Sequence, residues 1–479
     1  MAACSLARTT RFDLITTHRR RQRITATALG VVGATFIGVS LLWTHEESSS
    51  SAVSPASTTP LFSPRRLPAT IIDTASALRL QGQIESVSVG SDACFVVDDA
   101  GESIAEFNSN TPLRPASAMK LISSAGVVDL LGPGYRFATK VVGDSGSSSD
   151  SLTLVGSGDP VLSTPQGISA IERDPERSGS AITQLAVLAD RVVAAGVRSL
   201  PKGIVVDDHI FDERRYNPAW PISYRTDGEI GPIGALSVDS GWSNPSARTA
   251  SGEEPALAAG ASFAKLLRDR GVKVGGVSTG RASEGDTTVA EIKSPRLDEI
   301  VASILSASNN HGAEMLVKAV SADAGNTGST ADGVERIKRR LVQRGVSIDG
   351  LVMLDGSGLA RQDAVSCRTL TDVLHLGERP KTQVIKSGLA IAGVRGTLAP
   401  RLAGTELVGH LTAKTGTLNG VSALAGHLDV RRPLLFALIL NGSFSEQQAY
   451  AKREAIAKAI SRFPDAPISI TDLPLPGNP

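Results

Sequence analysis

The chain has 479 residues, of which 41% are apolar and 20% are charged. This composition is typical of a globular protein, and the length predicts two domains with additional segments. Lys and Arg total 49 against 48 Asp and Glu, so the formal net charge is +1. A balance this even disfavours nucleic acid as a partner, because nucleic-acid-binding surfaces are rich in basic residues.

The first predicted element is a membrane-spanning helix over residues 24–43, an uncharged run that would be about 30 Å long. Basic residues precede it in segment 1–23, and Glu46 and Glu47 follow it. The positive-inside rule therefore predicts a cytoplasmic N-terminus, a single-pass anchor in the plasma membrane, and the remainder of the chain outside. A cleaved signal peptide is the alternative interpretation. Residues 44–73, which are rich in Ser and Pro, are predicted to form an extended linker.

The three cysteines divide between compartments under this topology. Cys4 lies inside, whereas Cys94 and Cys367 lie outside, where a disulfide can persist. We expect a Cys94–Cys367 bond as a hypothesis, with two buried free thiols as the equally plain alternative.

The first folded segment, residues 74–140, is predicted to begin with a β-hairpin. Its two strand-like runs, 94–97 and 103–107, flank a turn at residues 99–101. A helix that starts near Pro115 and ends at the Gly-Pro-Gly sequence 132–134 follows the hairpin.

Ser117 and Lys120 share one face of this helix because they are three residues apart. Leu121 and Val128 continue that face, so Lys120 is expected on the apolar side. A serine next to a buried lysine is a nucleophile next to a base, provided that burial lowers the pKa of the lysine from about 10.4. The alternative is that Ser117 caps a core helix and Lys120 extends to solvent.

Residues 141–290 change in character and are predicted to be an inserted α/β domain. Short apolar runs alternate with Gly, Ser and Asp, and a helix is expected over residues 182–195. Residues 243–254 are polar and expected to be structureless. The helix over residues 256–270 is predicted to return the chain to the main domain.

Residues 291–463 are predicted to complete the first domain, and the tail 464–479 to be irregular. A helix starts at Pro295 and ends in Ser308-Asn309-Asn310, and further helices are expected over 311–320, 334–344 and 446–463. Strands are expected over 351–354, 411–417, 422–428 and 434–440, the last three as an antiparallel meander. The fold class is therefore mixed α/β, with an antiparallel sheet flanked by helices.

The strand over residues 411–417 carries Lys414-Thr415-Gly416-Thr417. An extended peptide can lie along such an edge, with its carboxylate near Lys414 and Thr415, while Gly416 permits close approach.

Ser-x-x-Lys, Ser-x-Asn and Lys-Thr-Gly, in that order, form the active-site triplet of penicillin-recognising serine enzymes. With residues 156–160 and 355–361, the sequence resembles the D-alanyl-D-alanine carboxypeptidases of peptidase family S13, the penicillin-binding protein 4 type. The resemblance covers about residues 75–463. It implies a transpeptidase-like domain interrupted by a large insertion after the Ser-x-x-Lys helix.

The resemblance also implies catalytic roles. Ser117 would be the acylated nucleophile and Lys120 its base. Ser308 would relay a proton to the leaving amine, and Asn310 would orient the substrate. Lys414 would attract the substrate carboxylate and help to keep Lys120 neutral.

Further positions are implied for substrate binding. These are Thr415, Gly416, Thr417 and Arg361, the last as a contact for the carboxylate of a diaminopimelate-type side chain or, alternatively, a surface arginine. The backbone amides of Ser117 and Thr417 would form the oxyanion hole. Asp227 is the candidate for the amino end of the substrate.

The implied activity is hydrolysis of the terminal D-Ala from peptidoglycan stem peptides on the cell-wall side of the membrane, with cross-bridge cleavage as a further candidate. β-Lactams would acylate the same serine. A β-lactamase and a catalytically inactive peptidoglycan-binding protein are the alternatives. No metal-ligand spacing and no dinucleotide loop is present in the sequence, so no metal or cofactor is expected.

Overall fold

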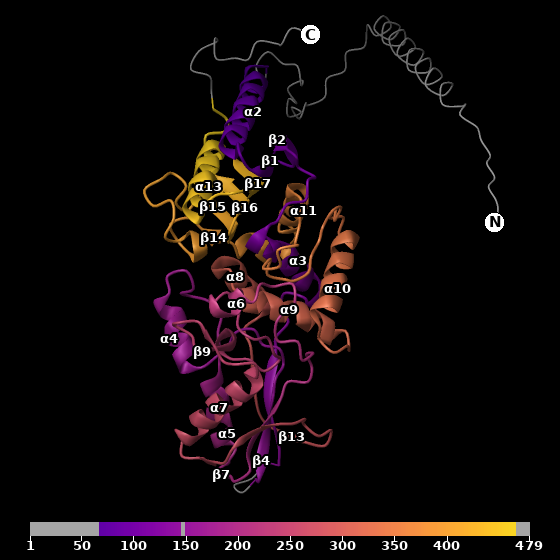
Figure 1. Ribbon diagram of the computed structural model, residues 1–479, viewed down its shortest axis with the longest axis vertical. Coiled ribbons are helices and arrows are strands. Elements are labelled where there is room, and N and C mark those ends of the chain that lie inside the picture. The colour runs from indigo at the N-terminus through magenta and orange to yellow at the C-terminus, as the bar shows by residue number, and fades with distance from the viewer. Residues whose placement is uncertain (1–66, 145–148, 466–479) are drawn as a thin grey trace, which may run out of the picture. The chain divides into compact units, whose positions relative to one another are not determined.

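The computed structural model describes residues 67–144 and 149–465 (Figure 1). The predicted cytoplasmic segment, the predicted anchor over residues 24–43 and most of the predicted tail lie outside these ranges. In the part of the chain that is described, no helix combines the length and apolar character that a membrane span needs.

The first described helix, α2, spans Leu67–Ser88 and begins inside the range predicted as linker. Its side chains at Leu80 and Ile84 are buried against the sheet and the C-terminal helix. The boundary of the linker at residue 73 is therefore wrong. The Ser- and Pro-rich composition ends before this apolar stripe begins, and burial of the stripe stabilises a helix.

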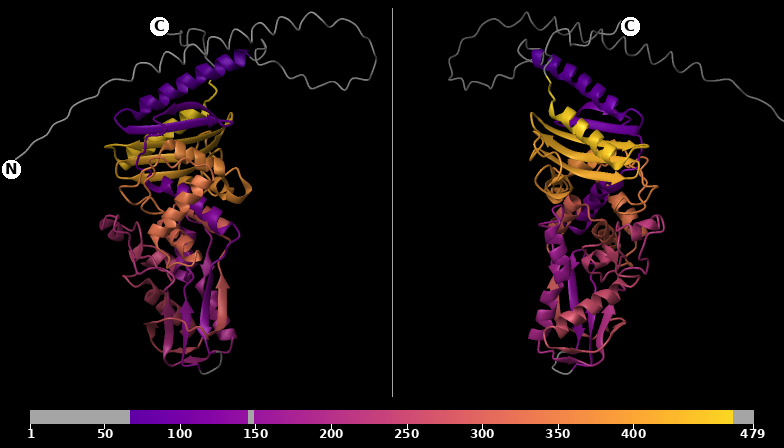
Figure 2. Two further views of the ribbon diagram at one scale, coloured as in Figure 1. Left: turned by 90° about the vertical axis from the view of Figure 1, so that its right-hand side faces the viewer. Right: turned by 60° about the vertical axis from the view of Figure 1, so that its left-hand side comes forward.

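Six strands form one antiparallel sheet in the order β14-β15-β16-β17-β1-β2 (Figure 2). The strands are β1 Asp92–Asp99, β2 Glu102–Phe107, β14 Ala390–Ile391, β15 Leu411–Leu418, β16 Val421–Asp429 and β17 Pro433–Asn441. The predicted hairpin and the predicted meander are thus confirmed, and β1 joins them by pairing with β17.

Successive side chains along each strand point to opposite faces of this sheet, and both faces are buried. Phe95 and Leu438 point to the side covered by α2 and α13 (Glu446–Ser461), whereas Val96 and Ile439 point to the side covered by α3 (Met119–Leu131) and α11 (Cys367–Leu376). Two hydrophobic layers therefore enclose the sheet.

The hypothesised disulfide is present. Cys94 of β1 is bonded to Cys367 at the start of α11, with their Cα atoms 5.8 Å apart and both side chains fully buried. The bond fixes α11 on the sheet, and the alternative of two free thiols is wrong.

The remaining helices of this part pack around α3. They are α8 Leu297–Ala307, α9 Asn310–Asp323, α10 Thr330–Gln343 and α12 Val384–Ser387, with short 3-10 helices η1 Ala116–Ala118, η3 Pro380–Thr382 and η4 Gly396–Leu398. Helix α8 begins at Leu297 rather than at Pro295, because the Glu299 carboxylate accepts the backbone N–H of Arg296 and caps the helix at that residue.

The strand predicted over residues 351–354 is wrong. Val352 forms only an isolated bridge with Ala364, and Leu354 donates its backbone N–H to a carboxylate oxygen of Asp363. This side-chain acceptor replaces a strand partner and leaves the segment as a loop.

A second sheet, of five strands, lies in the predicted insertion in the order β12-β8-β4-β3-β13. The strands are β3 Ala138–Gly143, β4 Ser151–Val155, β8 Gly203–Asp207, β12 Val277–Thr279 and β13 Thr287–Lys293. The neighbours β4–β8 and β8–β12 are parallel, and the others are antiparallel. Since β3 and β13 belong to this sheet, its strands reach slightly beyond the predicted boundaries at 141 and 290.

The helices α5 Leu185–Ala194 and α7 Pro255–Arg268 pack on this second sheet in a hydrophobic cluster of their own. Helix α7 was predicted to return to the main domain; instead Phe263 and Leu267 bury its apolar face in the insertion.

Short elements complete the segment: β5 Leu162–Ser163, α4 Pro165–Arg173, β6 Thr183–Gln184, β7 Ser199–Leu200, α6 Ser223–Thr226, η2 Asp239–Gly241, β9 Trp242–Asn244, β10 Thr249–Ala250 and β11 Lys273–Val274. The pairing of β9 with β10 corrects the expectation that residues 243–254 are structureless.

Candidate active site

Ser117 lies in η1, the single 3-10 turn that precedes α3. Lys120 is three residues further on, and its Nζ is 2.8 Å from Ser117 Oγ. Lys120 is fully buried, whereas Ser117 is half-buried. The alternative interpretation, in which the lysine extends to solvent, is wrong.

Two further oxygens hold the Lys120 amine in place. Nζ donates to Asn310 Oδ1 at 2.6 Å and to the carbonyl oxygen of Ser357 at 2.8 Å. Asn310 is the first residue of α9 and also donates from Nδ2 to the carbonyl of Glu229 at 2.8 Å. The amine thus joins α3, α9 and the loop after residue 354 at one point.

Ser308 and Lys414 form a second pair at the same site. Ser308 ends α8 in a left-handed conformation, with φ at 57°, and this bend directs the chain into α9. Lys414 is fully buried on β15, and its Nζ lies 2.9 Å from Ser308 Oγ. The structure therefore brings the Ser-x-x-Lys, Ser-x-Asn and Lys-Thr-Gly segments together.

Gly416 is required by the packing of the protein's own backbone. A Cβ at this position would lie 2.5 Å from the carbonyl oxygen of Pro115, in the turn that holds Ser117. The absent side chain lets β15 approach η1, and the role of this glycine toward a substrate stays a prediction.

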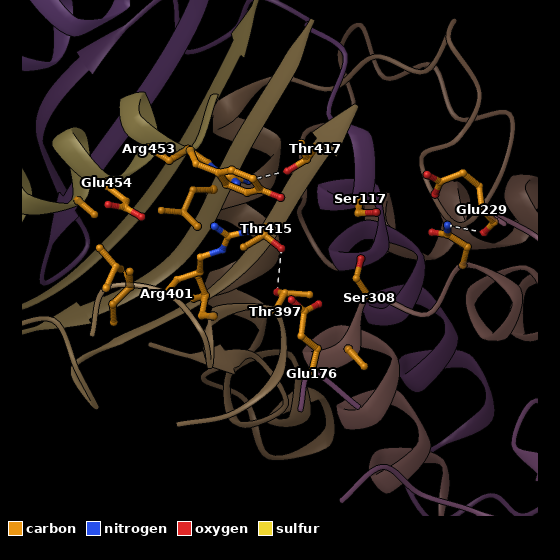
Figure 3. A pocket seen from close by; sticks show the side chains of 18 of the residues that line it. Ser117, Glu176, Glu229, Ser308, Thr397, Arg401, Thr415, Thr417, Arg453 and Glu454 are labelled. Atoms are coloured by element: carbon orange, nitrogen blue, oxygen red, sulfur yellow. Dashed lines mark hydrogen bonds between the residues drawn. The ribbon is translucent and has the colours of Figure 1, made fainter. Parts of the chain in front are cut away.

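A cavity of about 230 Å³ contains Ser117 and Ser308 and extends along β15 (Figure 3). The sequence candidates Asn310, Thr415 and Thr417 also line it. Sequence reasoning missed its other polar lining residues, which are Glu176, Glu229, Arg248, Thr397, Arg401, Tyr450, Arg453 and Glu454. They come from the inserted segment, from η4 and the chain that follows it, and from α13, and no motif marks them.

Two sequence candidates do not line this cavity. Arg361 is exposed and lies in a neighbouring cavity of about 610 Å³, which shares Ala116 with the turn of Ser117. Asp227 ends α6, and Glu229 lines the Ser117 cavity in its place because its backbone is held by Asn310.

Burial is the main cause of the electrostatic properties of both lysines. It lowers the pKa of Lys120 to about 8, against the opposing charges of Asp355, Glu314 and Glu229. Burial, followed by repulsion from Lys120 and Arg453, lowers the pKa of Lys414 well below its ordinary value. Burial is thus the main cause of the lowered pKa of Lys120, as the sequence predicts, and the repulsion between the two amines disfavours two charges at once.

Behind Lys120, the loop of residues 355–361 is held by the buried carboxylate of Asp355. This carboxylate accepts hydrogen bonds from Trp220 Nε1 at 2.7 Å and from the backbone N–H groups of Ser357, Gly358 and Ala360. Its function is structural, because it fixes the Ser357 carbonyl that accepts from Lys120.

Two more buried acids lie beside Asp355. Burial and the Asp355 charge raise the pKa of Glu314 to about 8, and the same causes raise the pKa of Asp363 to about 10. Protonation of these groups limits the negative charge near Lys120, which would otherwise raise the pKa of the amine further.

The rate of acylation is expected to rise with pH through about 8. Only the neutral form of Lys120 is able to accept a proton from Ser117, and its fraction grows as pH increases through the pKa of the group. The second-order rate constant for acylation by benzylpenicillin, measured between about pH 6 and pH 9, should increase roughly tenfold per unit on its acidic side. A constant that is flat over this range would exclude Lys120 as the titrating base.

The chemistry available to this arrangement is acyl transfer. A hydroxyl next to a buried amine of lowered pKa is an activated nucleophile, and the second hydroxyl next to a second amine can deliver a proton to a leaving group. In residues 67–144 and 149–465, no group of three or more His, Cys, Asp or Glu side chains is arranged to hold a metal ion.

The fold and this site define a serine acyl-transfer enzyme of the penicillin-recognising class. The model of the D-Ala-D-Ala carboxypeptidase 3 (S13) family matches residues 79–258 and 243–463, and the chain belongs to this family. The sequence resemblance is thus confirmed.

Two relatives show how far the similarity extends. The D-alanyl-D-alanine carboxypeptidase of Actinomadura sp. (strain R39) is 29% identical over 452 residues, which cover 77% of this chain and 80% of the relative. Carboxypeptidase DacB of Mycolicibacterium smegmatis is 30% identical over 356 residues, covering 72% and 75%.

Among solved structures, penicillin binding protein 4 of Haemophilus influenzae superposes with a TM-score of 0.66 at 21% identity, covering 80% of this chain and 98% of that one. A predatory peptidoglycan endopeptidase of Bdellovibrio bacteriovorus gives a TM-score of 0.51 at 17% identity, covering 80% and 94%. The predicted mixed α/β fold, with an antiparallel sheet flanked by helices, is thereby confirmed as similar to that of penicillin-binding protein 4.

Proposed function

We propose that the protein is a serine D-Ala-D-Ala carboxypeptidase that acts on peptidoglycan stem peptides through an acyl-enzyme on Ser117. The observation that carries this proposal is the 2.8 Å contact between Ser117 Oγ and the buried amine of Lys120 in a member of the S13 family. The names of the relatives support the reaction, since both are carboxypeptidases.

In the acylation step, Lys120 accepts the proton of the Ser117 hydroxyl while Oγ attacks the carbonyl carbon of the penultimate D-Ala. The backbone N–H groups of Ser117 and Thr417 stabilise the oxyanion, each donor contributing about 3 to 4 kcal/mol in acyl transfer. The C–N bond then breaks, and the Ser308 hydroxyl, next to Lys414, passes a proton to the departing amine of D-Ala. Ser308 is reprotonated by the proton that Lys120 took from Ser117, so Lys120 is neutral again.

In the deacylation step, water attacks the ester carbon while the neutral amine of Lys120 accepts a proton from it. The ester C–O bond then breaks, and Lys120 returns this proton to Ser117 Oγ, which restores the hydroxyl. The substrate carboxylate is held near Thr415 and Thr417, whose hydroxyls line the cavity, with the buried amine of Lys414 on the same strand. Thr415 is oriented by Thr397, whose hydroxyl lies 2.9 Å from its own.

Arg361 is proposed to contact the carboxylate of a diaminopimelate-type side chain. Its cavity adjoins the Ser117 turn and also holds Arg114, so a side chain that extends from the acylated residue meets two cations there. Cleavage of cross-bridges is a second candidate activity, supported by the Ser117 cavity, which continues past Thr415 to Arg401 and Tyr450 and offers room beyond the leaving amine.

For localisation, we propose a plasma-membrane anchor over residues 24–43 with the catalytic part on the cell-wall side. The uncharged run and its basic N-terminal flank support this topology. The Cys94–Cys367 bond supports an oxidising compartment for the folded part. The division into an inserted segment and a surrounding domain is also proposed, with the insertion reaching from β3 to β13 because both strands belong to its sheet.

Intact-mass analysis after treatment with benzylpenicillin tests the function. The wild type should gain the mass of one penicillin, and Ser117→Ala should gain none, because the hydroxyl is the only group that forms the ester. Ser124→Ala is the matched control, since Ser124 is a buried serine of the same helix outside the cavity. The untreated wild type should also release D-Ala from a D-Ala-D-Ala peptide.

The outcomes separate the alternatives. Equal labelling of Ser117→Ala and the wild type would exclude this nucleophile. An adduct that disappears within seconds, together with consumed penicillin, would instead favour a β-lactamase. A wild type without any adduct or D-Ala release would favour a catalytically inactive peptidoglycan-binding protein.

A further inference from the structure

Arg453 extends from α13 through to the cavity of Ser117. Its side chain is 5% exposed and lines that cavity together with Thr417. Nη1 donates to Thr417 Oγ1 at 3.0 Å and to the carbonyl oxygens of Gly416 and Ala423 at 3.1 and 3.3 Å. The guanidinium therefore touches the Lys-Thr-Gly strand from the side of the C-terminal helix (Figure 3).

This buried cation forms no ion pair with the part of the chain that the structure describes. Among the residues that the structure describes, no carboxylate lies within 4.0 Å of the Arg453 guanidinium. Its charged group packs 4.7 Å from the centre of the Tyr450 ring, and Arg401, also a cation, packs at 3.9 Å from the same ring. Burial lowers the pKa of Arg453 to about 10, so it is still charged at neutral pH. Buried charges in proteins are normally paired, and an uncompensated one on a cavity wall indicates an anionic ligand.

The hydrogen bond to Thr417 also settles the direction in which that hydroxyl can donate. Because Thr417 Oγ1 accepts from Arg453, its own O–H remains available to an acceptor in the cavity. The Thr417 hydroxyl can therefore donate into the cavity while the Arg453 guanidinium lies next to it, and the buried amine of Lys414 is on the same strand. Donors arranged in this way match the two oxygens of a carboxylate.

We propose that Arg453 is a specificity-determining residue that, with Thr417, recognises the free C-terminal carboxylate of the substrate. The inference rests on the proposed carboxypeptidase function and adds a residue for which neither the motif triplet nor its spacing provides a signal. Through this contact the enzyme selects peptides that end in a free carboxylate over peptides whose terminus is blocked, and it selects β-lactams in the same way.

The test compares two reagents that differ only in this charge, benzylpenicillin and its methyl ester. Second-order rate constants for acylation of Ser117 are measured by intact mass for the wild type, Arg453→Gln and Arg453→Lys. The ratio of the acid to the ester constant should fall about tenfold in Arg453→Gln, the size expected for one charge-assisted hydrogen bond. The constant for the ester should stay within about threefold of the wild type. Arg453→Lys, which keeps a cation, should lose about threefold in the ratio.

Lys452→Gln is the matched control, because the neighbouring cation on α13 donates to the backbone of Val87, away from the cavity. Its ratio should equal that of the wild type. An equal loss for acid and ester in the Arg453 variants would overturn the proposal, since it would show that the arginine only supports the strand. An unchanged ratio would overturn it as well. If Arg453→Gln does not fold, the ratio in Arg453→Lys decides by the same two criteria. Failure of the proposed function would give a different result, namely that Ser117→Ala still gains the mass of benzylpenicillin.

Discussion

Lys120→Met should reduce the rate of acylation by benzylpenicillin at least about a thousandfold, the range that a positioned general base contributes. The methionine fills the same buried volume but offers no lone pair to accept the Ser117 proton. The Nζ contacts to Ser117, Asn310 and the Ser357 carbonyl are lost together. Rapid mixing followed by intact-mass analysis measures the constant, and far-UV circular dichroism shows that the fold is retained.

Lys318→Met is the matched control for this variant. Lys318 is also a buried lysine, on α9, but it pairs with Asp212 and does not line the Ser117 cavity. Its acylation rate should remain within a few-fold of the wild type, even if its stability decreases. Near-normal acylation of Lys120→Met would show that another group is the base, and an equal loss in both variants would point to damage to the fold.

Loss of the Cys94–Cys367 bond should lower the free energy of unfolding by about 5 kcal/mol. The two residues are 273 positions apart, so in the chain-entropy account the closed loop strongly restricts the unfolded chain. The double variant Cys94→Ser/Cys367→Ser and the reduced wild type should both unfold at lower denaturant concentration than the oxidised wild type. Equilibrium unfolding followed by tryptophan fluorescence measures the difference.

A thiol count accompanies this measurement. The oxidised chain should show one reactive thiol after denaturation, that of Cys4, and three after reduction. Equal counts with and without reductant would contradict the bond. Equal stability of the oxidised protein and the double variant would show that packing of α11 on β1, rather than the cross-link, holds this layer of the fold.

The elements that were predicted well are those whose evidence is local in the sequence. The hairpin β1–β2, the meander β15–β17 and the helix that carries Ser117 and Lys120 follow from periodicity, turns and helix-ending glycines. The predictions that failed depend on contacts between distant segments. Helix α2 gains its stability from the sheet and α13. The segment over residues 351–354 is a loop because the carboxylate of Asp363 accepts the backbone N–H of Leu354, which a strand pattern does not reveal.

The same difference between local evidence and contacts of distant segments applies to the residues of the candidate active site. Ser117, Lys120, Ser308, Asn310 and Lys414 could be named because three short motifs occur in a known order. Arg453, Glu176 and Glu229 could not, because nothing in their own neighbourhoods distinguishes them from surface charges. They reach the cavity only through the packing of α13 and of the inserted segment against it.

The sequence by itself placed the chain in its family and singled out the candidate nucleophile and its neighbouring base, since these depend on residue identity and on short, characteristic spacings. It left the Cys94–Cys367 bond as one of two alternatives, which the structure decided. Only the tertiary structure decided why Gly416 must lack a side chain, which cation lies behind Thr417, and that burial sets the pKa of Lys120. These properties arise from surfaces that meet after folding, and the distance between two side chains in space is not encoded by their separation along the chain.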